Sequence, residues 1–200
     1  MSSQQYHISL IQMDIRLGDP QYNQQRAGEW IAQAMAAEQK PDVIVLPEMW
    51  NTGYALDRLD GIAEPENGPI TRWLSETAAQ YNVVLVGGSI SEQRSNGFYN
   101  TLYAYGRDGR ELTRYDKIHL FKLMDEEKFM QPGEQTSLFP LGDVTAAASI
   151  CYDIRFPELA RTLALSGAKV WFVPAEWPHP RLHHWRTLLT ARAIENQMYV

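Results

Sequence analysis

The feature that most constrains the fold is a regular alternation of short apolar runs with stretches in which apolar residues recur at helical spacing. The apolar runs are rich in β-branched residues, and two of them stop at Pro47 and Pro174, as buried strands do. Runs of this form occupy residues 7–14, 42–46, 83–90, 144–150 and 168–174. Strands that alternate with helices are typical of α/β architecture, so we expect this chain to fold in that class.

Four stretches are predicted to be helices. They follow Gly18-Asp19-Pro20, follow Gly68-Pro69, run from Pro157 to near Gly167, and cover 182–193. Proline suits the first turn of a helix. Three apolar faces are formed by Ala27, Trp30, Ile31, Ala34 and Met35, by Ile70, Trp73, Leu74, Thr77, Ala78 and Tyr81, and by Leu182, Trp185, Leu188, Leu189 and Ala193. One-sided helices are expected to cover a sheet.

Two segments depart from the simple alternation. Asp108-Gly109 lies between two alternating runs within residues 99–121, which is the strongest short signal for a β-hairpin and predicts an antiparallel insert. The last three residues, 198–200, look like the beginning of another strand. We therefore expect one domain, residues 1–200, that lacks its C-terminal part.

Composition narrows the classes of partner. Hydrophobic residues make up 44% of the 200 residues, which is enough for a globular domain with a sizeable core. The net charge of −6 provides no basic face, so nucleic acid is not an expected partner. The N-terminal segment lacks the build of a signal peptide, and no apolar run approaches the roughly 20 residues of a membrane span. We expect a small-molecule partner, no membrane contact and a cytoplasmic location.

The single cysteine, Cys151, excludes an internal disulfide and a structural zinc site of the usual kind. It ends the run "AAASIC", while "VIVLPE" ends with Glu48 and "RYDK" ends with Lys117. Ligands and catalytic groups collect beyond the carboxyl ends of strands in open α/β sheets. An acid, an amine and a thiol are therefore expected to meet.

These three groups together suit acyl transfer. A thiol near its free pKa is mostly protonated, and it needs a base or a nearby cation to become a nucleophile. Glu48 can be the base and Lys117 the cation. Lys117 can also face the oxyanion of a tetrahedral intermediate, together with the backbone N–H of Tyr152, and this chemistry needs no metal or cofactor. Most lone cysteines are buried packing residues, so composition alone leaves both interpretations of Cys151 open.

The histidines offer two alternatives. His119 lies two residues after Lys117 and shares its face on an extended segment, so it could activate a thiol or support the lysine, and we expect the structural role. His179, His183 and His184 form a cluster that could suggest a metal. Adjacent histidines on a helix point in different directions and no cysteine accompanies them, so a solvated or pocket-edge position is expected and no metal site.

Longer blocks around the three groups resemble a known family. "VIVLPEMWNTGY", "YDKIHLF" and "SICYDIRFPEL" resemble, in order, the signature blocks of the nitrilase superfamily, the carbon–nitrogen hydrolases with a Glu-Lys-Cys triad. The similarity continues through "GPITRWLSETAAQYNVVLVGGS" and "LLTARAIENQMYV" and covers essentially the whole chain. It implies Glu48 as general base, Lys117 as oxyanion stabiliser and Cys151 as nucleophile. It also implies a four-layer α-β-β-α sandwich with mixed sheets, assembled as a homodimer or larger oligomer.

The resemblance also suggests site residues outside the triad. Family members often carry a second glutamate that orients the lysine and the substrate, and "LMDEEKFMQPGE" offers Glu126 and Glu127. The distance to Gly133 favours Glu126, although either could be a surface charge. Tyr54 follows the Glu48 block and Trp177 follows a strand, so both could wall a substrate pocket or simply pack.

The segments "CYDIRFPEL", "AEWP" and "ARAIENQ" resemble the ω-amidase-like branch, which acts on amides of 2-oxo dicarboxylic acids such as 2-oxoglutaramate. This implies hydrolysis of a small linear carboxamide to acid and ammonia through a cysteine thioester. Arg155 could bind the free substrate carboxylate as a fork, or brace the local turn through Asp153 or Glu158. The alternatives are an N-carbamoyl amine or amino-acid hydrolase, a nitrilase with the same triad, and an inactive binding or assembly protein.

Overall fold

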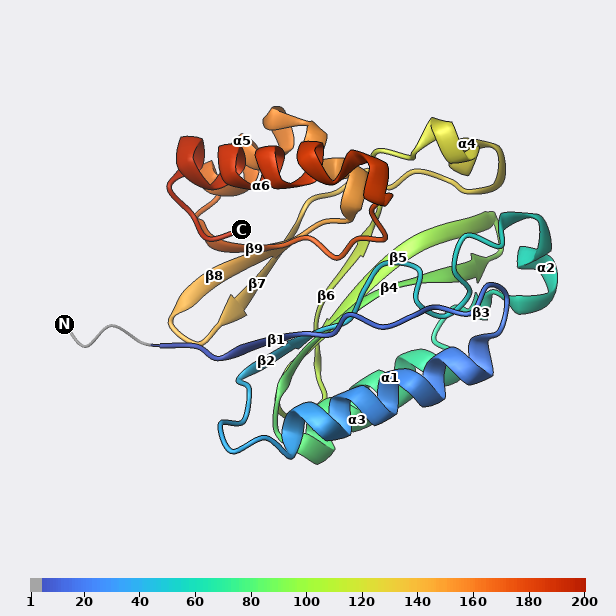
Figure 1. Cartoon of the computed structure of the whole chain (residues 1–200), viewed down its shortest axis with the longest axis horizontal. Coiled ribbons are helices and arrows are strands. Elements are labelled where there is room, and N and C mark those ends of the chain that lie inside the picture. Colours follow the sequence, from blue (N-terminus) through green and yellow to red (C-terminus); the bar gives the residue numbers. More distant parts are fainter. Residues whose placement is uncertain (1–4) are drawn as a thin grey trace.

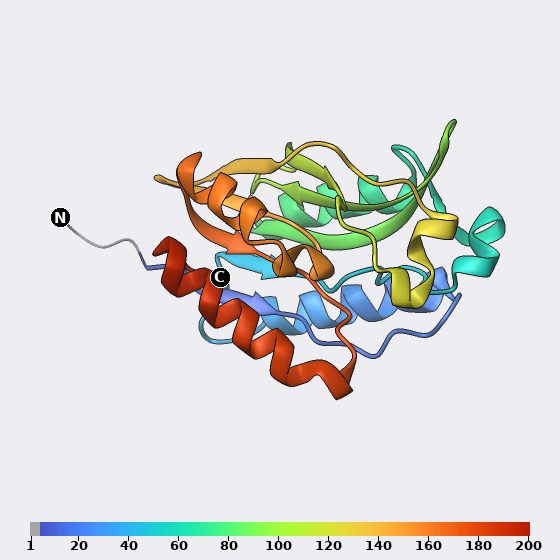
Figure 2. The same ribbon diagram turned by 90° about the horizontal axis from the view of Figure 1, so that it is seen from above.

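Two β-sheets lie face to face between two pairs of helices in the computed structural model, which describes residues 5–200 (Figure 1). Helices α1 (Pro20–Met35) and α3 (Pro69–Tyr81) cover the outer face of the larger sheet, and α5 (Pro157–Leu165) and α6 (Leu182–Asn196) cover that of the smaller sheet. The short helices α2 (Leu59–Ile62) and α4 (Glu126–Phe129) lie at one end of the molecule in both views (Figures 1 and 2). The layers follow the order α-β-β-α that the family resemblance implied.

The larger sheet combines parallel and antiparallel pairing. Its main path runs β1 (Ile8–Leu10), β2 (Val43–Val45), β4 (Val84–Arg94), β5 (Gly97–Tyr105) and β6 (Glu111–Asp116), and β3 (Glu64–Pro65) pairs with β4. Strands β1, β2 and β4 are mutually parallel, whereas β4, β5 and β6 are antiparallel neighbours. Strand β2 is a fully buried run of β-branched residues, as expected for a parallel strand that is covered on both faces, whereas Ile8 and Leu10 of β1 are exposed.

The smaller sheet has the order β7 (Ser137–Leu141), β8 (Val144–Ala148) and β9 (Ala168–Phe172). Strands β7 and β8 are antiparallel, and β8 and β9 are parallel with α5 between them in sequence. Both sheets are therefore mixed, and the predicted fold class is confirmed.

Helix boundaries follow local chemistry. Helix α1 begins where the Asp19 carboxylate accepts the Tyr22 N–H at 3.1 Å and Pro20 occupies the first turn, an arrangement that satisfies a free helical donor. Helix α3 begins at Pro69 and ends at Asn82, which takes the left-handed conformation with φ of 52°. Asparagine is one of the residues that tolerate this conformation at a helix end.

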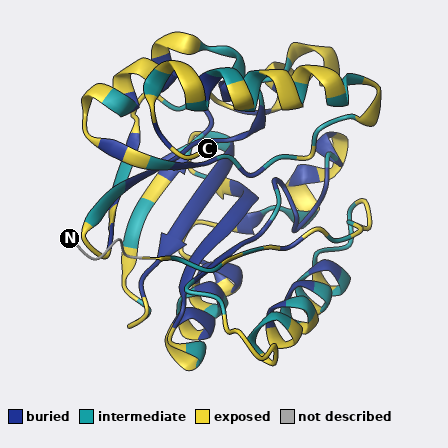
Figure 3. Cartoon of the chain, turned by 60° about the vertical axis from the view of Figure 1, so that its left-hand side comes forward, coloured by how far each residue is buried: buried dark blue, intermediate teal, exposed yellow. Residues whose placement is uncertain are grey.

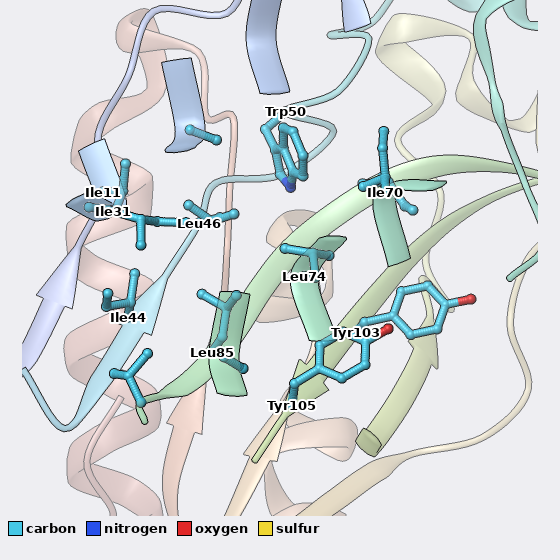
Figure 4. Packing of buried hydrophobic residues seen from close by; sticks show 14 residues of the cluster. Ile11, Ile31, Ile44, Leu46, Trp50, Ile70, Leu74, Leu85, Tyr103 and Tyr105 are labelled. Atoms are coloured by element: carbon cyan, nitrogen blue, oxygen red, sulfur yellow. The ribbon is translucent and has the colours of Figure 1, made fainter. Parts of the chain in front are cut away.

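Strand alternation divides the core into layers. Ile44 packs with Leu74 and Leu85 between the larger sheet and its helices (Figure 4). Its neighbours Val43 and Val45 point the other way, into the core between the two sheets, as successive strand residues do. A third core lies beneath α5 and α6. Figure 3 shows the result, with the central strands buried and the outer helix faces exposed.

Most predicted elements are confirmed with shifted bounds. The first strand covers Ile8–Leu10, not residues 7–14, because the chain leaves the ladder after Ile11, whose N–H donates to the Val45 carbonyl at 2.9 Å. The hairpin at Asp108-Gly109 joins β5 to β6, and its predicted antiparallel pairing is confirmed; with β4 these strands form half of the larger sheet. Strand β7 was not predicted.

The last described residues pair with the smaller sheet. Tyr199 donates to the Lys169 carbonyl at 2.9 Å and accepts from the Trp171 N–H at 2.8 Å, so the predicted start of a strand is confirmed. The predicted apolar face of α6 is only partly buried against the third core. Within residues 5–200, no helix combines the length and the apolar character that a membrane crossing requires.

Candidate active site

Three connections that leave strand ends meet between the two sheets. The connection after β2 carries Glu48, the residue directly after β6 is Lys117, and the turn after β8 begins with Cys151. Glu48 and Lys117 have no exposed surface, and Cys151 is 6% exposed. The charges of Glu48 and Lys117 both act on the Cys151 thiol. The structure thus brings the three predicted groups together in one buried site.

A bulge in β4 holds the connection that carries Glu48. Ser89 donates its N–H to the Pro47 carbonyl at 3.1 Å, and its hydroxyl accepts the Met49 N–H at 2.9 Å. Gly88 has φ of 63°, and a Cβ there would collide with the Pro47 carbonyl oxygen. Glycine is therefore needed for this close approach of two backbones.

The Lys117 ammonium lies between two buried carboxylates. Its Nζ is 2.8 Å from Glu48 Oε1 and 2.8 Å from Glu126 Oε2, and it donates to the Tyr54 hydroxyl at 3.3 Å. On the main chain, the Lys117 N–H donates to the Asn100 carbonyl at 2.9 Å, which continues the β5–β6 pairing past the end of β6. Strand pairing fixes one end of this lysine and ion pairs fix the other.

Of the two glutamates that begin α4, the first enters the site. Glu126 is completely buried, and besides the lysine it accepts the Phe121 N–H at 2.7 Å on Oε2 and the Asn100 Nδ2 at 2.9 Å on Oε1. Glu127 is exposed. The sequence favoured Glu126 over Glu127, and the structure places Glu126 against the lysine.

The two carboxylate oxygens of Glu48 have different surroundings. Oε1 accepts three hydrogen bonds, from Lys117 Nζ at 2.8 Å, the Tyr54 hydroxyl at 2.6 Å and Asn100 Nδ2 at 3.2 Å. Oε2 accepts the Glu176 N–H at 2.8 Å. Because a carboxylate oxygen offers about two lone-pair sites, Oε1 is saturated and Oε2 retains room for one more donor.

Cys151 occupies a sharp turn between β8 and α5. Its φ is 45°, in the left-handed region that few residues other than glycine adopt. Its N–H donates to the Pro174 carbonyl at 2.9 Å, and it opens the 3₁₀ turn Cys151–Arg155. The first N–H groups of such a turn have no partner within it, and the Tyr152 N–H is one of them.

Asp153 ties the cysteine turn to the lysine segment. Its fully buried carboxylate accepts the Ile150 N–H at 2.9 Å, the Tyr115 hydroxyl at 2.7 Å and the His119 N–H at 3.0 Å. His119 Nδ1 lies 2.7 Å from the same carboxylate, and its ring stacks on Phe156 with centroids 3.4 Å apart. This placement fits the structural role expected for His119.

Burial and mutual charge set the protonation states. Burial raises the pKa of the Cys151 thiol well above its usual value, and the charge of Glu48 adds to this effect. Burial alone would lower the pKa of Lys117, but Glu48 and Glu126 outweigh it and raise that pKa. Burial also opposes ionisation of Glu48, yet the lysine charge and donated hydrogen bonds lower its pKa. Burial raises the pKa of Glu126. At rest, the thiol is protonated and Glu48 is ionised.

A small pocket opens onto Cys151. Its walls are formed by Tyr54, Phe121, Met124, Tyr152, Arg155, Glu176, Trp177, Pro178 and Arg181. The guanidinium carbon of Arg155 lies 5.5 Å from the Tyr152 ring centroid and 5.1 Å from that of Trp177. Its Nη2 is 3.3 Å from His184 Nδ1. Among the described residues, neither Asp153 nor Glu158 forms an ion pair with Arg155, so the alternative bracing role has no contact to support it.

Three further histidines lie where α6 begins. His183 and His184 are adjacent and exposed, with ring centroids 6.1 Å apart, and His179 is also exposed. A group of three or more histidine, cysteine, aspartate or glutamate side chains able to hold a metal does not occur in residues 5–200.

Two groups at the site were not predicted from the sequence. Asn100 contacts both buried glutamates, and extending the β5–β6 register from Thr101↔Asp116 by one residue pairs it with Lys117. The hairpin signal at Asp108-Gly109 could therefore have pointed to it. Glu176 contributes its backbone N–H to Glu48. Although its side chain reaches solvent, surrounding protein atoms and the charge of Glu48 raise its pKa to about 7.

Comparison with known proteins finds relatives across nearly the whole chain. The chain is 43% identical over 193 residues to a 2-oxoglutaramate amidase of Bacillus subtilis, which covers 96% of this chain and 73% of that protein. It is 35% identical over 205 residues to the omega-amidase NIT2 of Homo sapiens, which covers 98% of this chain and 72% of that protein.

A solved structure gives the same result for the fold. XC1258 from Xanthomonas campestris, a CN-hydrolase superfamily protein with an arsenic adduct in its active site, superimposes with a TM-score of 0.88 at 30% sequence identity, covering 96% of this chain and 73% of that one. The carbon–nitrogen hydrolase family matches residues 7–200. With its α-β-β-α layers and these relatives, the chain belongs to the carbon–nitrogen hydrolase family.

Proposed function

We propose that this chain hydrolyses the carboxamide of a 2-oxo dicarboxylic acid monoamide, such as 2-oxoglutaramate, to the diacid and ammonia. Its family acts on carbon–nitrogen bonds, and two relatives carry the names 2-oxoglutaramate amidase and omega-amidase. The observation that carries the proposal is the pocket that joins a buried thiol, Cys151, beside an ionised carboxylate, Glu48, to a guanidinium, Arg155.

In the first step, the Cys151 sulfur attacks the amide carbonyl carbon while Glu48 takes the thiol proton. Oε2 of Glu48 suits this role because it has room for another donor. A carbon–sulfur bond forms, and the carbonyl π electrons move onto oxygen. The Lys117 ammonium and the Tyr152 N–H are the proposed donors to that oxyanion, and preorganised donors of this kind are often the largest contribution to catalysis.

In the second step, the oxyanion collapses, the carbon–nitrogen bond breaks and ammonia leaves with the proton that Glu48 had accepted. Cys151 now carries the acyl group as a thioester. A water molecule then attacks the thioester carbonyl and gives a proton to Glu48, the carbon–sulfur bond breaks, and the sulfur recovers the proton. Covalent catalysis divides one difficult step into two easier ones.

Two side chains support this machinery without reacting. Glu126 holds the Lys117 ammonium at 2.8 Å, and we propose that it orients the lysine. The Tyr54 hydroxyl donates to Glu48 Oε1 at 2.6 Å, so Tyr54 is proposed to orient the base as well as to wall the pocket.

Arg155 is the proposed partner of the free substrate carboxylate. Its guanidinium lies against the rings of Tyr152 and Trp177, and a guanidinium can form a two-point contact with a carboxylate. Trp177 then forms the apolar wall beside the acyl chain. This arrangement supports an amide that bears a carboxylate over a neutral one.

A substrate panel tests the proposal. Ammonia release from 2-oxoglutaramate, from an N-carbamoyl amine and from a small nitrile is measured with the unmodified protein and with Cys151→Ala. We expect release from 2-oxoglutaramate alone, none with Cys151→Ala, and an acyl adduct on Cys151 by mass spectrometry after brief exposure. Faster release from the carbamoyl compound or acid from the nitrile would favour those hydrolases. If neither turnover nor an adduct is found, the result would favour a binding or assembly protein.

The substrate carboxylate has its own test. Arg155→Leu should raise KM for 2-oxoglutaramate by about 10- to 100-fold, which is the loss expected for a charged hydrogen-bonded contact, and should leave a neutral amide unaffected. Arg186→Leu, on the exposed face of α6, is the matched control. An equal effect of Arg155→Leu on both amides would refute the contact.

We further propose, on the family resemblance, that the protein forms a homodimer or larger oligomer and works in the cytoplasm. Light scattering after size-exclusion chromatography gives the assembly state, and cell fractionation gives the compartment.

A further inference from the structure

Asn100 contacts both carboxylates at the centre of the site and the backbone of Lys117. It is completely buried in β5, and its Nδ2 lies 3.2 Å from Glu48 Oε1 and 2.9 Å from Glu126 Oε1. Its carbonyl oxygen accepts the Lys117 N–H at 2.9 Å. Side chain and main chain of one residue thus contact both carboxylates and the lysine between them.

The orientation of the Asn100 amide follows from chemistry. Ionised carboxylates only accept hydrogen bonds, so the NH₂ group must face the two glutamates. The amide oxygen then points away, and it is buried without a hydrogen-bond partner among the described residues. Leaving a polar atom unpaired in the interior is unfavourable, so stability alone does not account for asparagine here. The two hydrogen bonds that the amide donates to the glutamates account for it.

These hydrogens matter because negative charge exceeds positive charge around Glu48. The titratable groups that face Glu48 and Glu126, from every element packed against them, are Lys117, Tyr54, Cys151 and Glu176. Only the lysine among these supplies a positive charge. Each carboxylate accepts one hydrogen bond from the Asn100 amide in addition to its contact with the lysine. The amide therefore lies between the two carboxylates and offsets part of the negative charge of each.

We infer that Asn100 is a positioning residue that bridges Glu48 and Glu126, keeps both ionised beside a single lysine, and occupies Oε1 of Glu48 so that Oε2 receives the thiol proton. The inference rests on the roles proposed above for Glu48 and Cys151. The Asn100 hydrogen bond is one of the causes that lower the pKa of Glu126, which burial raises. Removal of this bond should therefore move protonation of the carboxylate pair to higher pH.

The test uses Asn100→Leu, which has a similar volume and no donor, and Asn100→Asp, which adds a third carboxylate. The readouts are the pH dependence of kcat and of the alkylation rate of Cys151 by iodoacetamide. We expect kcat to fall about tenfold or more with KM within about threefold, since about two orders of magnitude is typical for general-base catalysis. The acid limb of both profiles should move to higher pH in Asn100→Leu, and further in Asn100→Asp.

Thr101→Val is the matched control. Thr101 is the next residue on β5, equally buried, and its hydroxyl donates to Asp116 Oδ1 at 2.8 Å outside the site. Thr101→Val and Asn100→Leu each remove a buried hydrogen bond, so both should lower the melting temperature. Only Asn100→Leu should move the acid limb. If Asn100→Leu does not fold, Asn100→Ser, which keeps one hydroxyl donor, should give a smaller shift in the same direction.

Two results would overturn the inference. One is an acid limb that stays in place in the Asn100 variants while only the amplitude falls, and the other is an equal shift in Thr101→Val. Alkylation depends on no particular substrate. A shifted alkylation profile without ammonia release would therefore support the role inferred for Asn100 and refute the proposed substrate. Ammonia release with an unshifted alkylation profile would support the substrate and refute the role of Asn100.

Discussion

Lys117 is the residue on which the electrostatics of the site depend. It is completely buried and forms two 2.8 Å ion pairs, with Glu48 and Glu126. Removing one partner of a buried ion pair leaves uncompensated charge in a medium of low dielectric constant. The lysine therefore stabilises the fold as well as the proposed oxyanion, and these two contributions can be separated by experiment.

Lys117→Met keeps the length of the side chain and removes its charge. We expect it to lower the free energy of unfolding by about 3–5 kcal/mol, the usual cost of breaking a buried pair, and to abolish amidase activity. Urea unfolding at pH 7 measures the first effect. Lys128→Met is the control, because Lys128 also forms a 2.8 Å pair, with Asp125, but in full solvent exposure. It should leave the unfolding midpoint unchanged, and similar losses in both variants would contradict this account.

The adjacent glutamates of α4 provide a second matched pair. Glu126→Gln removes the carboxylate that holds the lysine, so kcat should fall at least about tenfold, because misorientation of a catalytic group is costly even at small displacements. Glu127→Gln alters an exposed neighbour of the same size and should leave kcat unchanged. Steady-state kinetics on the proposed amide measure both. Equal effects of the two changes on kcat would refute the role of Glu126 in orienting the lysine.

The candidate site could be predicted only in part, for reasons visible in individual residues. Glu48, Lys117 and Cys151 could be predicted because each follows a predicted strand, where catalytic groups collect, and because each lies in a block that resembles the family. Asn100 was not predicted because it lies inside a strand. An asparagine there looks like any polar strand residue until the β5–β6 register is known. The Glu176 N–H was missed because a backbone donor leaves no trace in residue type.

At the scale of elements, the β4 bulge is the device that aims Glu48. It brings Ser89 against Pro47 and Met49, and Trp50 Nε1 donates to the Gly87 carbonyl at 2.8 Å. The connection after β2 is thereby held at several points over a few residues. A change in the bulge should disturb Glu48 without touching any charged side chain.

Gly88→Ala tests this expectation. Its positive φ and the adjacent Pro47 carbonyl leave no space for a Cβ, so we expect a loss of about 2–4 kcal/mol in stability, within the range of backbone strain combined with overpacking. Gly61→Ala is the control, since a Cβ there meets nothing within 4 Å, and replacing such a glycine is expected to be neutral or stabilising. Thermal unfolding of both variants provides the comparison. A Gly88→Ala protein as stable as Gly61→Ala would contradict the close approach.

Elements were easier to predict than their arrangement. The four longer helices were predicted from their helical spacing, and the β5–β6 turn was predicted because Asp108-Gly109 is a strong local signal. The short helices α2 and α4 were not predicted. Strand β7 escaped because "SLFPL" contains Pro140, which lowers the expectation of a strand. The division into two sheets came from the family resemblance, because alternation alone is equally compatible with a single doubly wound sheet.

At the scale of the whole molecule, the site is a joint between the two sheets. Glu48 receives hydrogen bonds from Tyr54, Lys117 and Asn100 on the side of the larger sheet, and from Glu176, which follows β9 of the smaller sheet. The ionised carboxylate therefore links the two halves. Its protonation should weaken the whole fold as well as the catalytic step.

The sign of the pH effect follows from the pKa of Glu48, which lies below its ordinary value of 4.5 because the lysine charge and hydrogen bonds outweigh burial. The ionised form contributes stability that is fully present above the unfolded pKa and is lost as the pH falls through the lower folded pKa. The unmodified protein should therefore lose more stability between pH 6 and pH 3 than Glu48→Gln does. At neutral pH it should be the more stable of the two.

Urea unfolding across this pH range measures the difference, and the two stability curves should converge as the pH falls. Burial and the charge of Glu48 raise the pKa of Glu126, which acts in the opposite direction, so the comparison is repeated with Glu126→Gln in both proteins. The convergence should persist there, because the ordering of Glu48 by Tyr54 and Glu176 does not involve Glu126. Parallel curves in both backgrounds would mean that folding does not favour ionised Glu48, and the proton acceptor for Cys151 would have to be sought elsewhere.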